Sequence, residues 1–137
     1  MSSCRKPIGA MFIAAVPLLF AACSSSDKVQ THQVGDYFLT VSTDPGTLRV
    51  GSDAEITVHI EKDDESMENC HPYFRQYMPA HQMATDHTMH SMEALEKGLY
   101  RGRGGEFGMG GNWELEFQFN CGDGMKTIVF PYELNWM

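Results

Sequence analysis

The amino-acid sequence predicts an all-β protein, folded as an antiparallel β-sandwich of about seven strands. Turn signals rich in Gly, Pro, Asn and Asp recur about every eight to twelve residues. Two segments between such signals, 54–61 and 113–119, alternate apolar and polar residues. This alternation is typical of strands with one buried face. No segment shows the apolar periodicity of a long helix, so the strands must build the core themselves.

The first strand segment, VGDYFLTVST, is rich in aromatic and β-branched residues and stops at the turn Asp44-Pro45-Gly46. The expected strands are 34–43, 48–50, 54–61, 70–77, a strand beginning at 98–100, 113–119 and 127–134. The acidic segment 61–68 is predicted to be a solvated loop, and 93–97 to form one helical turn. The expected core is Phe38, Val41, Ile56, Val58, Ile60, Tyr100, Trp113, Leu115, Phe117, Phe119, Ile128 and Phe130.

The first 22 residues have the pattern of an export signal. Arg5 and Lys6 precede an apolar segment that is too short to span a bilayer comfortably. The sequence LFAAC that ends at Cys23 resembles a bacterial lipoprotein box, in which the cysteine carries the lipid. We therefore expect a lipoprotein signal peptide at 1–22, the lipidated Cys23 with a flexible tether over 23–33, and one folded domain over 34–137. A plain signal peptide cut after Ala22, or an uncleaved anchor, is the alternative.

These features predict a lipid-anchored protein of the cell envelope. Ser24 after the lipidated cysteine favours the outer membrane, facing the periplasm, in a Gram-negative host. The whole chain has ten basic and eighteen acidic residues. This acidity argues against a nucleic-acid partner, because a phosphate-binding surface needs the opposite charge. It also argues against binding to anionic headgroups, so membrane attachment would depend on the acyl chains.

Two cysteines remain in the expected folded domain, Cys70 and Cys121. Leftover cysteines in an oxidising compartment most often pair, so we predict a disulfide between them. The alternative is that Cys70, next to His71, is a metal ligand.

The segment MPAHQMATDHTMHSM, residues 78–92, holds four methionines and three histidines. It contains three His-x-Met pairs, and on an extended segment residues two apart point to the same side. Thioether sulfur and imidazole nitrogen suit Cu(I), and imidazole also suits Cu(II). The candidate ligands from this segment are His81, Met83, His87, Met89, His90 and Met92. Zinc is the alternative metal, in a tetrahedral set with a carboxylate such as Asp86. The alternative without a metal is that methionines such as Met78 and Met92 fill the core.

The order of motifs around this segment resembles the YtkA-like domain. The residues concerned are Met78-Pro79-x-His81, the His-rich segment, Gly98-x-Tyr100, and Phe107-x-Met109-x-Gly111-x-Trp113-Glu114. This chain has Gln82-Met83 where the family commonly has Gly-His, and Gly110 where it commonly has Pro. The resemblance implies an immunoglobulin-like β-sandwich in a bacterial envelope protein that handles copper. It also implies Met109 as a further sulfur ligand.

Taken together, the residues and the resemblance predict an envelope lipoprotein that binds copper for buffering or for delivery to another envelope protein. The alternative is an immunoglobulin-like protein-interaction module whose metal affinity is incidental. No catalytic motif of the hydrolase, zinc-protease, thiol-redox or phosphate-loop type is present, so we do not expect an enzyme.

Overall fold

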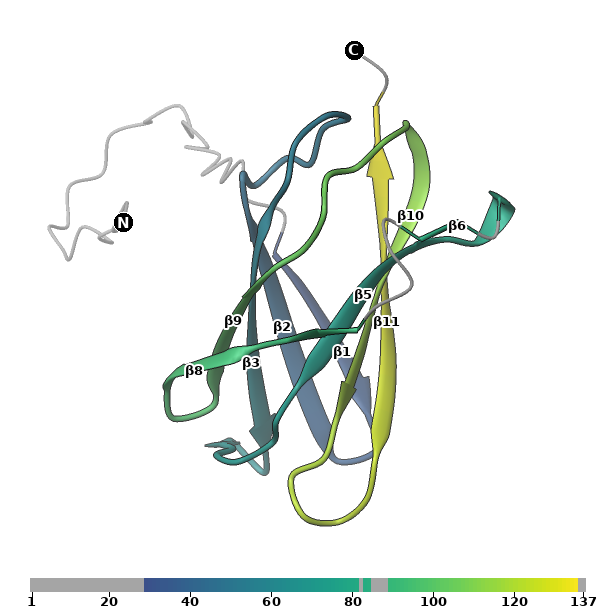
Figure 1. The fold of residues 1–137 in the computed structure, drawn as a ribbon. Helices are drawn as coiled ribbons and strands as arrows, with labels where there is room; N and C mark the ends of the chain where they lie inside the picture. Colours follow the sequence, from purple (N-terminus) through teal and green to yellow (C-terminus); the bar gives the residue numbers. More distant parts are fainter. Residues whose placement is uncertain (1–28, 82, 85–88, 136–137) are drawn as a thin grey trace, which may run out of the picture.

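The computed structural model describes residues 29–81, 83–84 and 89–135. Two antiparallel sheets face each other and form a β-sandwich, which confirms the predicted all-β fold (Figure 1). Among these described residues, no helix is long and apolar enough to cross a membrane.

The first sheet has six strands in the order β1-β2-β3-β9-β8, with β4 also paired to β3. Its strands are β1 (Gln30–Val34), β2 (Tyr37–Asp44), β3 (Glu55–Lys62), β4 (Glu65–Ser66), β8 (Glu93–Glu96) and β9 (Leu99–Arg103). The acidic segment after β3 is a tight hairpin, not an open loop, because Asp63 and Asp64 adopt positive φ angles of 52° and 62°. Residues 93–96 form an edge strand in place of the predicted helical turn.

The first expected strand differs from the prediction. A turn at Gly35-Asp36 divides the expected strand 34–43 into a hairpin of β1 and β2, with Val34 opposite Tyr37. Gly35 has a φ of 57°, which glycine adopts without steric cost. Residues 30–33, four residues of the expected tether, belong to β1 of the first sheet.

The second sheet has five strands in the order β11-β10-β5-β6, with β7 also paired to β5. Its strands are β5 (Tyr73–Met78), β6 (Met83–Ala84), β7 (His90–Ser91), β10 (Gly111–Phe119) and β11 (Lys126–Leu134). A short 3-10 helix, η1 (Pro79–His81), follows β5. The extra strands relative to the predicted seven are mostly short, and they arise at hairpins and sheet edges.

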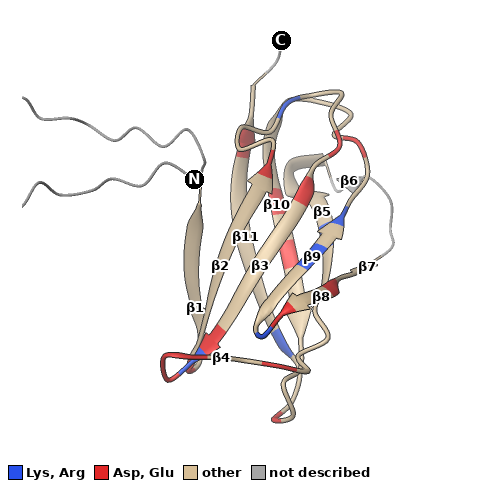
Figure 2. Cartoon of the chain, turned by 90° about the vertical axis from the view of Figure 1, so that its left-hand side faces the viewer, with Lys and Arg blue, Asp and Glu red and all other residues tan. Residues whose placement is uncertain are grey.

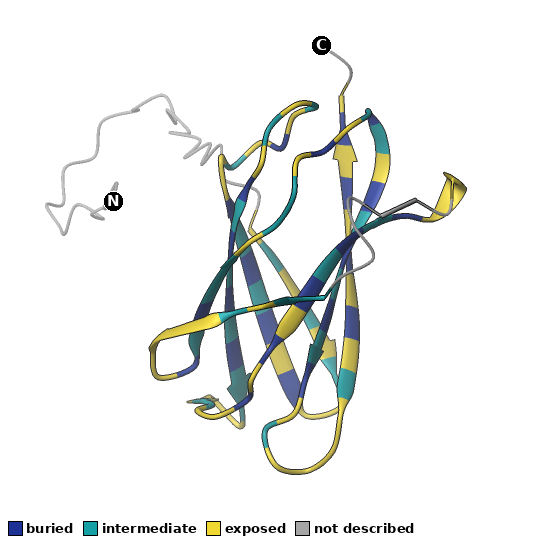
Figure 3. Cartoon of the chain, viewed as in Figure 1, coloured by how far each residue is buried: buried dark blue, intermediate teal, exposed yellow. Residues whose placement is uncertain are grey.

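The core lies between the sheets and follows the alternation of the strands (Figure 3). In its centre, the ring of Phe117 lies 5.5 Å from that of Phe130 and 6.0 Å from that of Phe74. Each aromatic or aliphatic side chain buried in this way stabilises the fold by about 1.5–3 kcal/mol. The prediction for Phe38 was wrong: its side chain is 43% exposed, while its neighbours Tyr37 and Leu39 are buried. The Gly35 turn places the odd-numbered residues of β2 inward, and the other predicted core residues are buried.

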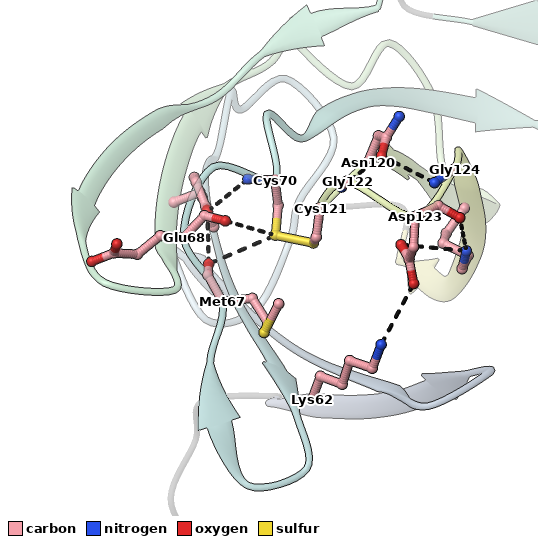
Figure 4. The surroundings of a disulfide bond; sticks show 11 residues. Lys62, Met67, Glu68, Cys70, Asn120, Cys121, Gly122, Asp123 and Gly124 are labelled. Atoms are coloured by element: carbon pink, nitrogen blue, oxygen red, sulfur yellow. Dashed lines mark hydrogen bonds and ion pairs between the residues drawn. A yellow bond between two sulfur atoms is a disulfide. The ribbon is translucent and has the colours of Figure 1, made fainter.

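A disulfide joins Cys70 to Cys121 and confirms the predicted pairing (Figure 4). It links the segment before β5 to the residues after β10. The Tyr100 hydroxyl donates to the Met67 carbonyl at 2.8 Å and accepts from the backbone N–H of Cys70 at 3.2 Å. These contacts tie the two sheets together at one end of the sandwich, which we call the disulfide pole.

The opposite end holds the start of β1, the end of β5 with η1, the connection 104–110 and the end of β11 (Figures 1 and 2). We call it the donor pole, because the Met/His segment begins there. The acidic β3–β4 hairpin lies at the disulfide pole (Figure 2).

Candidate functional site

The Met/His segment returns along the edge of β5 after η1 reverses the chain. Ala84 pairs with Tyr77 on β6, and His90 pairs with Phe74 on β7. Five residues separate Ala84 from His90, whereas two separate Phe74 from Tyr77. The two short strands therefore pair with β5 in different registers, and each brings its own potential ligands to a different level of the sheet.

The upper level contains His81 and Met83. His81 ends η1 and is exposed, and η1 lies against β10. Met83 is the register partner of Met78. Pro79 follows Met78 directly, and its ring keeps Met78 in the extended conformation that ends β5. Because His81 is part of a 3-10 helix, the extended geometry expected for the pair His81-x-Met83 does not hold.

Met78 is a core residue. Its side chain is 1% exposed, and its Cε atom lies against Gly111 at the start of β10. A Cβ atom at Gly111 would lie 3.3 Å from that methyl group, so glycine leaves the space that the methionine fills. Met78 therefore joins β5, β6 and β10 at the donor pole, and it supports the site by packing.

Met109 lies in the connection 104–110, two residues before β10. Its side chain is half-buried against the core, and its carbonyl accepts a hydrogen bond from Trp113 Nε1 at 2.9 Å. Phe107, in the same connection, is buried and stands edge-on to Trp113 with 5.2 Å between ring centroids. The backbone N–H of Phe107 also donates to the Ser52 carbonyl at 3.1 Å. The connection is thus held in place, and so is Met109.

Gln76 supplies a further constraint that the sequence analysis missed. This side chain on β5 is fully buried, and its amide makes two hydrogen bonds with the backbone of Gly105. Nε2 donates to the Gly105 carbonyl at 3.0 Å, and Oε1 accepts from the Gly105 N–H at 2.8 Å. The amide acts as a strand partner for a segment that leaves the sheet. A polar residue at an inward position between Phe74 and Met78 was the available sign.

The lower level contains His90 and Met92, whose side chains meet Phe74. The His90 ring lies 5.3 Å from the Phe74 ring. Phe74 and Met92 both approach Gly102, where a Cβ atom would lie 2.7 Å from Phe74 Cε1 and 3.2 Å from Met92 Cγ. The Met92 N–H donates to the Pro72 carbonyl at 3.1 Å. Met92 thus packs on the core, as the alternative interpretation expected.

Met89 is half-buried just before β7. His87 lies outside the described residues, and so does Asp86, the predicted zinc carboxylate. The levels of Met78 and Phe74 are four residues apart on β5, which is about 13 Å along an extended strand. The upper and lower levels are therefore two donor groups: the upper group of His81, Met83 and Met109, and the lower group of Met89, His90 and Met92.

The donor set fits a soft metal better than a hard one. Each group combines imidazole nitrogen with thioether sulfur, which are ligands for copper and not for Ca²⁺ or Mg²⁺. Within the described ranges, no three His, Cys, Asp or Glu side chains are placed to hold a metal ion together. A zinc site of that composition would therefore have to include residues outside those ranges.

The outer face of β5 carries no uncompensated positive charge next to these groups. Arg75 forms an ion pair with Glu116 at 2.9 Å, and its guanidinium lies 5.1 Å from the centre of the Tyr77 ring. A cation at the donor pole would therefore meet no unpaired arginine from β5.

Comparisons with solved structures support the fold. A DUF4785 family protein from Legionella pneumophila superposes with a TM-score of 0.53 at 15% identity, over 76% of this chain. This chain spans 29% of that protein's length. A DUF4426 family protein from Pseudomonas aeruginosa superposes with a TM-score of 0.50 at 13% identity, over 77% of this chain and 93% of its own. At these identities the likeness concerns the fold alone.

A comparison with curated protein sequences finds no match. The model of the family described as YtkA-like matches residues 31–118, which is well over half of the chain. The match includes both donor groups and Cys70, and it ends within β10, before Cys121. The protein belongs to the YtkA-like family.

Proposed function

We propose that this protein is a lipid-anchored envelope protein that binds copper at the donor pole and buffers it or delivers it to another envelope protein. The observation that supports the proposal is that three separate segments lie at the donor pole. These segments are η1 with His81, β6 with Met83, and the connection with Met109. One histidine and two methionines are a combination of residue types that suits Cu(I).

The upper group is the better candidate for exchangeable binding. His81 is exposed, and Met109 is half-buried on a connection that Gln76 and Trp113 hold in place. The lower group packs on Phe74 and Gly102, so its side chains already have a structural role. A carrier that must release its metal needs ligands that an acceptor can reach, which the exposed His81 provides. His87 and Met89 stay predicted ligands from the sequence.

Anaerobic titration of the mature protein with Cu(I), against competing chelators of graded strength, tests the proposal. We expect about one Cu(I) per protein. Replacing both His81 and Met83 by alanine should abolish retention. Met109→Leu should weaken retention while it keeps the packing volume, because leucine lacks the sulfur but has a similar size. Unchanged retention in both variants would contradict the proposal.

The matched control uses the same residue types at the disulfide pole. His71 is exposed with a φ of 44°, which asparagine tolerates, and Met125 is 60% exposed. The double variant His71→Asn and Met125→Ala removes one imidazole and one thioether far from the donor pole, and it should retain copper like the wild type. Parallel titration with Zn(II) separates the alternative metal, because a zinc protein would hold Zn(II) more tightly than Cu(I).

A protein-interaction module is the second candidate, and one surface feature favours it. A hollow of about 320 Å³ lies on the outer face of β10 and β11, and Pro79 of η1 forms part of its wall. Glu114 and Glu133 also line it. In this case the His81→Ala and Met83→Ala variant would bind its protein partner normally, and the wild type would lose Cu(I) to a weak chelator.

A further inference from the structure

We infer that the hollow beside η1 receives an arginine side chain of a basic partner protein. The outer face of β10 and β11 next to η1 is then the docking surface for that partner. The inference rests on the proposed function in one respect, which is that the partner would be the protein that accepts copper. The contact itself involves no metal and is tested without one.

Two carboxylates without a partner line the hollow, those of Glu114 and Glu133. Glu114 pairs with Pro131, and Asn112 with Glu133, so the two glutamates are diagonal neighbours on one face of the sheet. Their Cβ atoms are about 7 Å apart. Among the described residues, neither carboxylate has an ion pair or a side-chain hydrogen bond. Like charges this close repel each other, and a cation between them replaces the repulsion with attraction.

The walls of the hollow are apolar. Since β5 and β11 flank β10, Pro79 after β5 stands on one side and Pro131 of β11 on the other. The space between them measures about 320 Å³. An arginine side chain has an apolar stem and a charged planar end, so its stem can lie against the prolines while its guanidinium meets the carboxylates. A bare metal ion would leave the apolar walls in contact with water.

The same sheet face already contains one arrangement of this kind. Arg75 Nη2 donates to Glu116 Oε2 at 2.9 Å, and the guanidinium lies 5.1 Å from the centre of the Tyr77 ring. Glu114 lies two residues before Glu116 on β10 and is the register partner of Tyr77. Glu114 thus has the same kind of surroundings as Glu116 but no arginine among the described residues. An arginine from a partner would complete the second arrangement.

The charge of this chain favours a partner other than a second copy. The whole chain has a net charge of −8. Within the described ranges, Arg49 and Lys97 are the only arginine and lysine residues outside ion pairs. A basic protein is therefore a better source of the arginine. Pro79 lies two residues before the exposed His81, so a partner in the hollow would lie beside the upper donor group.

An NMR titration with N-acetylarginine methylamide tests the inference on the same mature protein as the copper titration, without metal. We expect saturable shifts of the backbone amides of Asn112, Glu114 and Glu133. N-acetylcitrulline methylamide, which has a neutral urea in place of the guanidinium, should cause none. The double variant Glu114→Gln and Glu133→Gln should bind the arginine probe about tenfold more weakly, as expected for the loss of two partly exposed ion pairs. An equal response to both probes, or unchanged binding in the variant, would overturn the inference.

The matched control removes the same amount of charge at the disulfide pole. Asp63 and Asp64 have φ angles of 52° and 62°, which asparagine tolerates. The double variant Asp63→Asn and Asp64→Asn should therefore fold normally and bind the arginine probe like the wild type. If it weakens binding as much as the glutamate variant does, only the net charge of the protein acts, and the inference is wrong.

Two further measurements identify other occupants of the hollow. Sedimentation equilibrium should show a monomer, and a dimer that Glu114→Gln dissociates would assign the surface to a second copy. Binding of the probe only after Lys28→Gln would mean that the chain's own basic residue fills the hollow. Either result would overturn the inference. The copper proposal fails separately, because loss of Cu(I) to a weak chelator leaves the arginine titration unchanged.

Discussion

Replacing Gly104 by alanine tests how the connection that carries Met109 is held. A Cβ atom at position 104 would overlap Gln76 Oε1 and would lie 2.7 Å from Gln76 Cδ. Contacts this close do not occur, so the Gln76 amide must move by about 1 Å or more to reach an ordinary contact distance. Because Gln76 is fully buried, this movement takes it out of both hydrogen bonds with Gly105.

The expected cost follows from those two hydrogen bonds. Each contributes about 0.5–1.5 kcal/mol when made, and a buried group left without a partner costs about 1–3 kcal/mol. Gly105 is only half-buried, so water recovers part of this loss. We expect the free energy of unfolding to fall by about 2–3 kcal/mol in Gly104→Ala.

A double-mutant cycle identifies the cause. Gln76→Ala removes the atoms that the new methyl group would meet, so Gly104→Ala should cost little in that background. The expected coupling energy is about 1–3 kcal/mol. Gly108→Ala is the matched control in the same connection, since nothing lies within 4 Å of its Cβ position. Urea titration, followed by Trp fluorescence and far-UV circular dichroism, measures all four proteins and the control.

Two results would refute this reasoning. One is a Gly104→Ala protein that is no less stable than Gly108→Ala. The other is an equal cost of Gly104→Ala in the wild type and in the Gln76→Ala background. If the reasoning holds, Gly104→Ala should also retain Cu(I) less tightly, because Met109 lies on the displaced connection.

The remaining predictions concern the disulfide pole and the core. Replacing Cys70 and Cys121 by alanine removes a disulfide that joins residues with a sequence separation of 51. Urea titration should then show a free energy of unfolding that is lower by about 4 kcal/mol on the chain-entropy model. An unchanged midpoint would contradict the idea that the disulfide restricts the unfolded chain. Tyr132→Phe removes a buried hydroxyl that has no hydrogen-bond partner in the described part of the chain, so unfolding should cost up to about 1 kcal/mol more; a less stable variant would reveal a partner. A hydrogen bond from Tyr37 lowers the pKa of Asp123 from its ordinary 3.8. The ionised carboxylate therefore stabilises the fold above that pH, and this contribution is lost as the pH falls through the lowered pKa. Wild-type and Asp123→Asn stabilities should converge in acid, and a constant difference would count against the hydrogen bond.

Most strands were predictable because their signals are local. Alternation in β3 and β10 identifies both the strand and its buried face, and Ile56, Val58, Leu115 and Phe117 are buried as expected. The β1–β2 hairpin was missed because one Gly-Asp turn lies inside a continuous β-branched and aromatic segment. Phe38 and Val41 were both expected inside, but residues three apart on one strand lie on opposite faces, and β2 buries Leu39 together with Val41. The buried face of a strand follows from where its hairpin turns.

The candidate site was predictable in composition and not in geometry. The sequence alone identified the three His-x-Met pairs and Met109 as possible soft-metal ligands. It did not indicate that β6 and β7 pair with β5 in different registers, which divides the ligands into two groups. Nor did it indicate the roles of Gln76 and Gly102, whose partners lie on other strands.

By itself, the sequence determined the fold class, the disulfide partners and the donor chemistry, because each depends on residue type and on short-range patterns. Only the tertiary structure decided which donors share a level, which end of the sandwich they occupy, and that the chain enters the domain at the same end. These properties depend on pairings between strands far apart in the chain, such as Gln30 with Pro131 and Glu114 with Tyr77. Such pairings are selected by the free energy of the whole packed core. No single segment of the sequence determines that free energy.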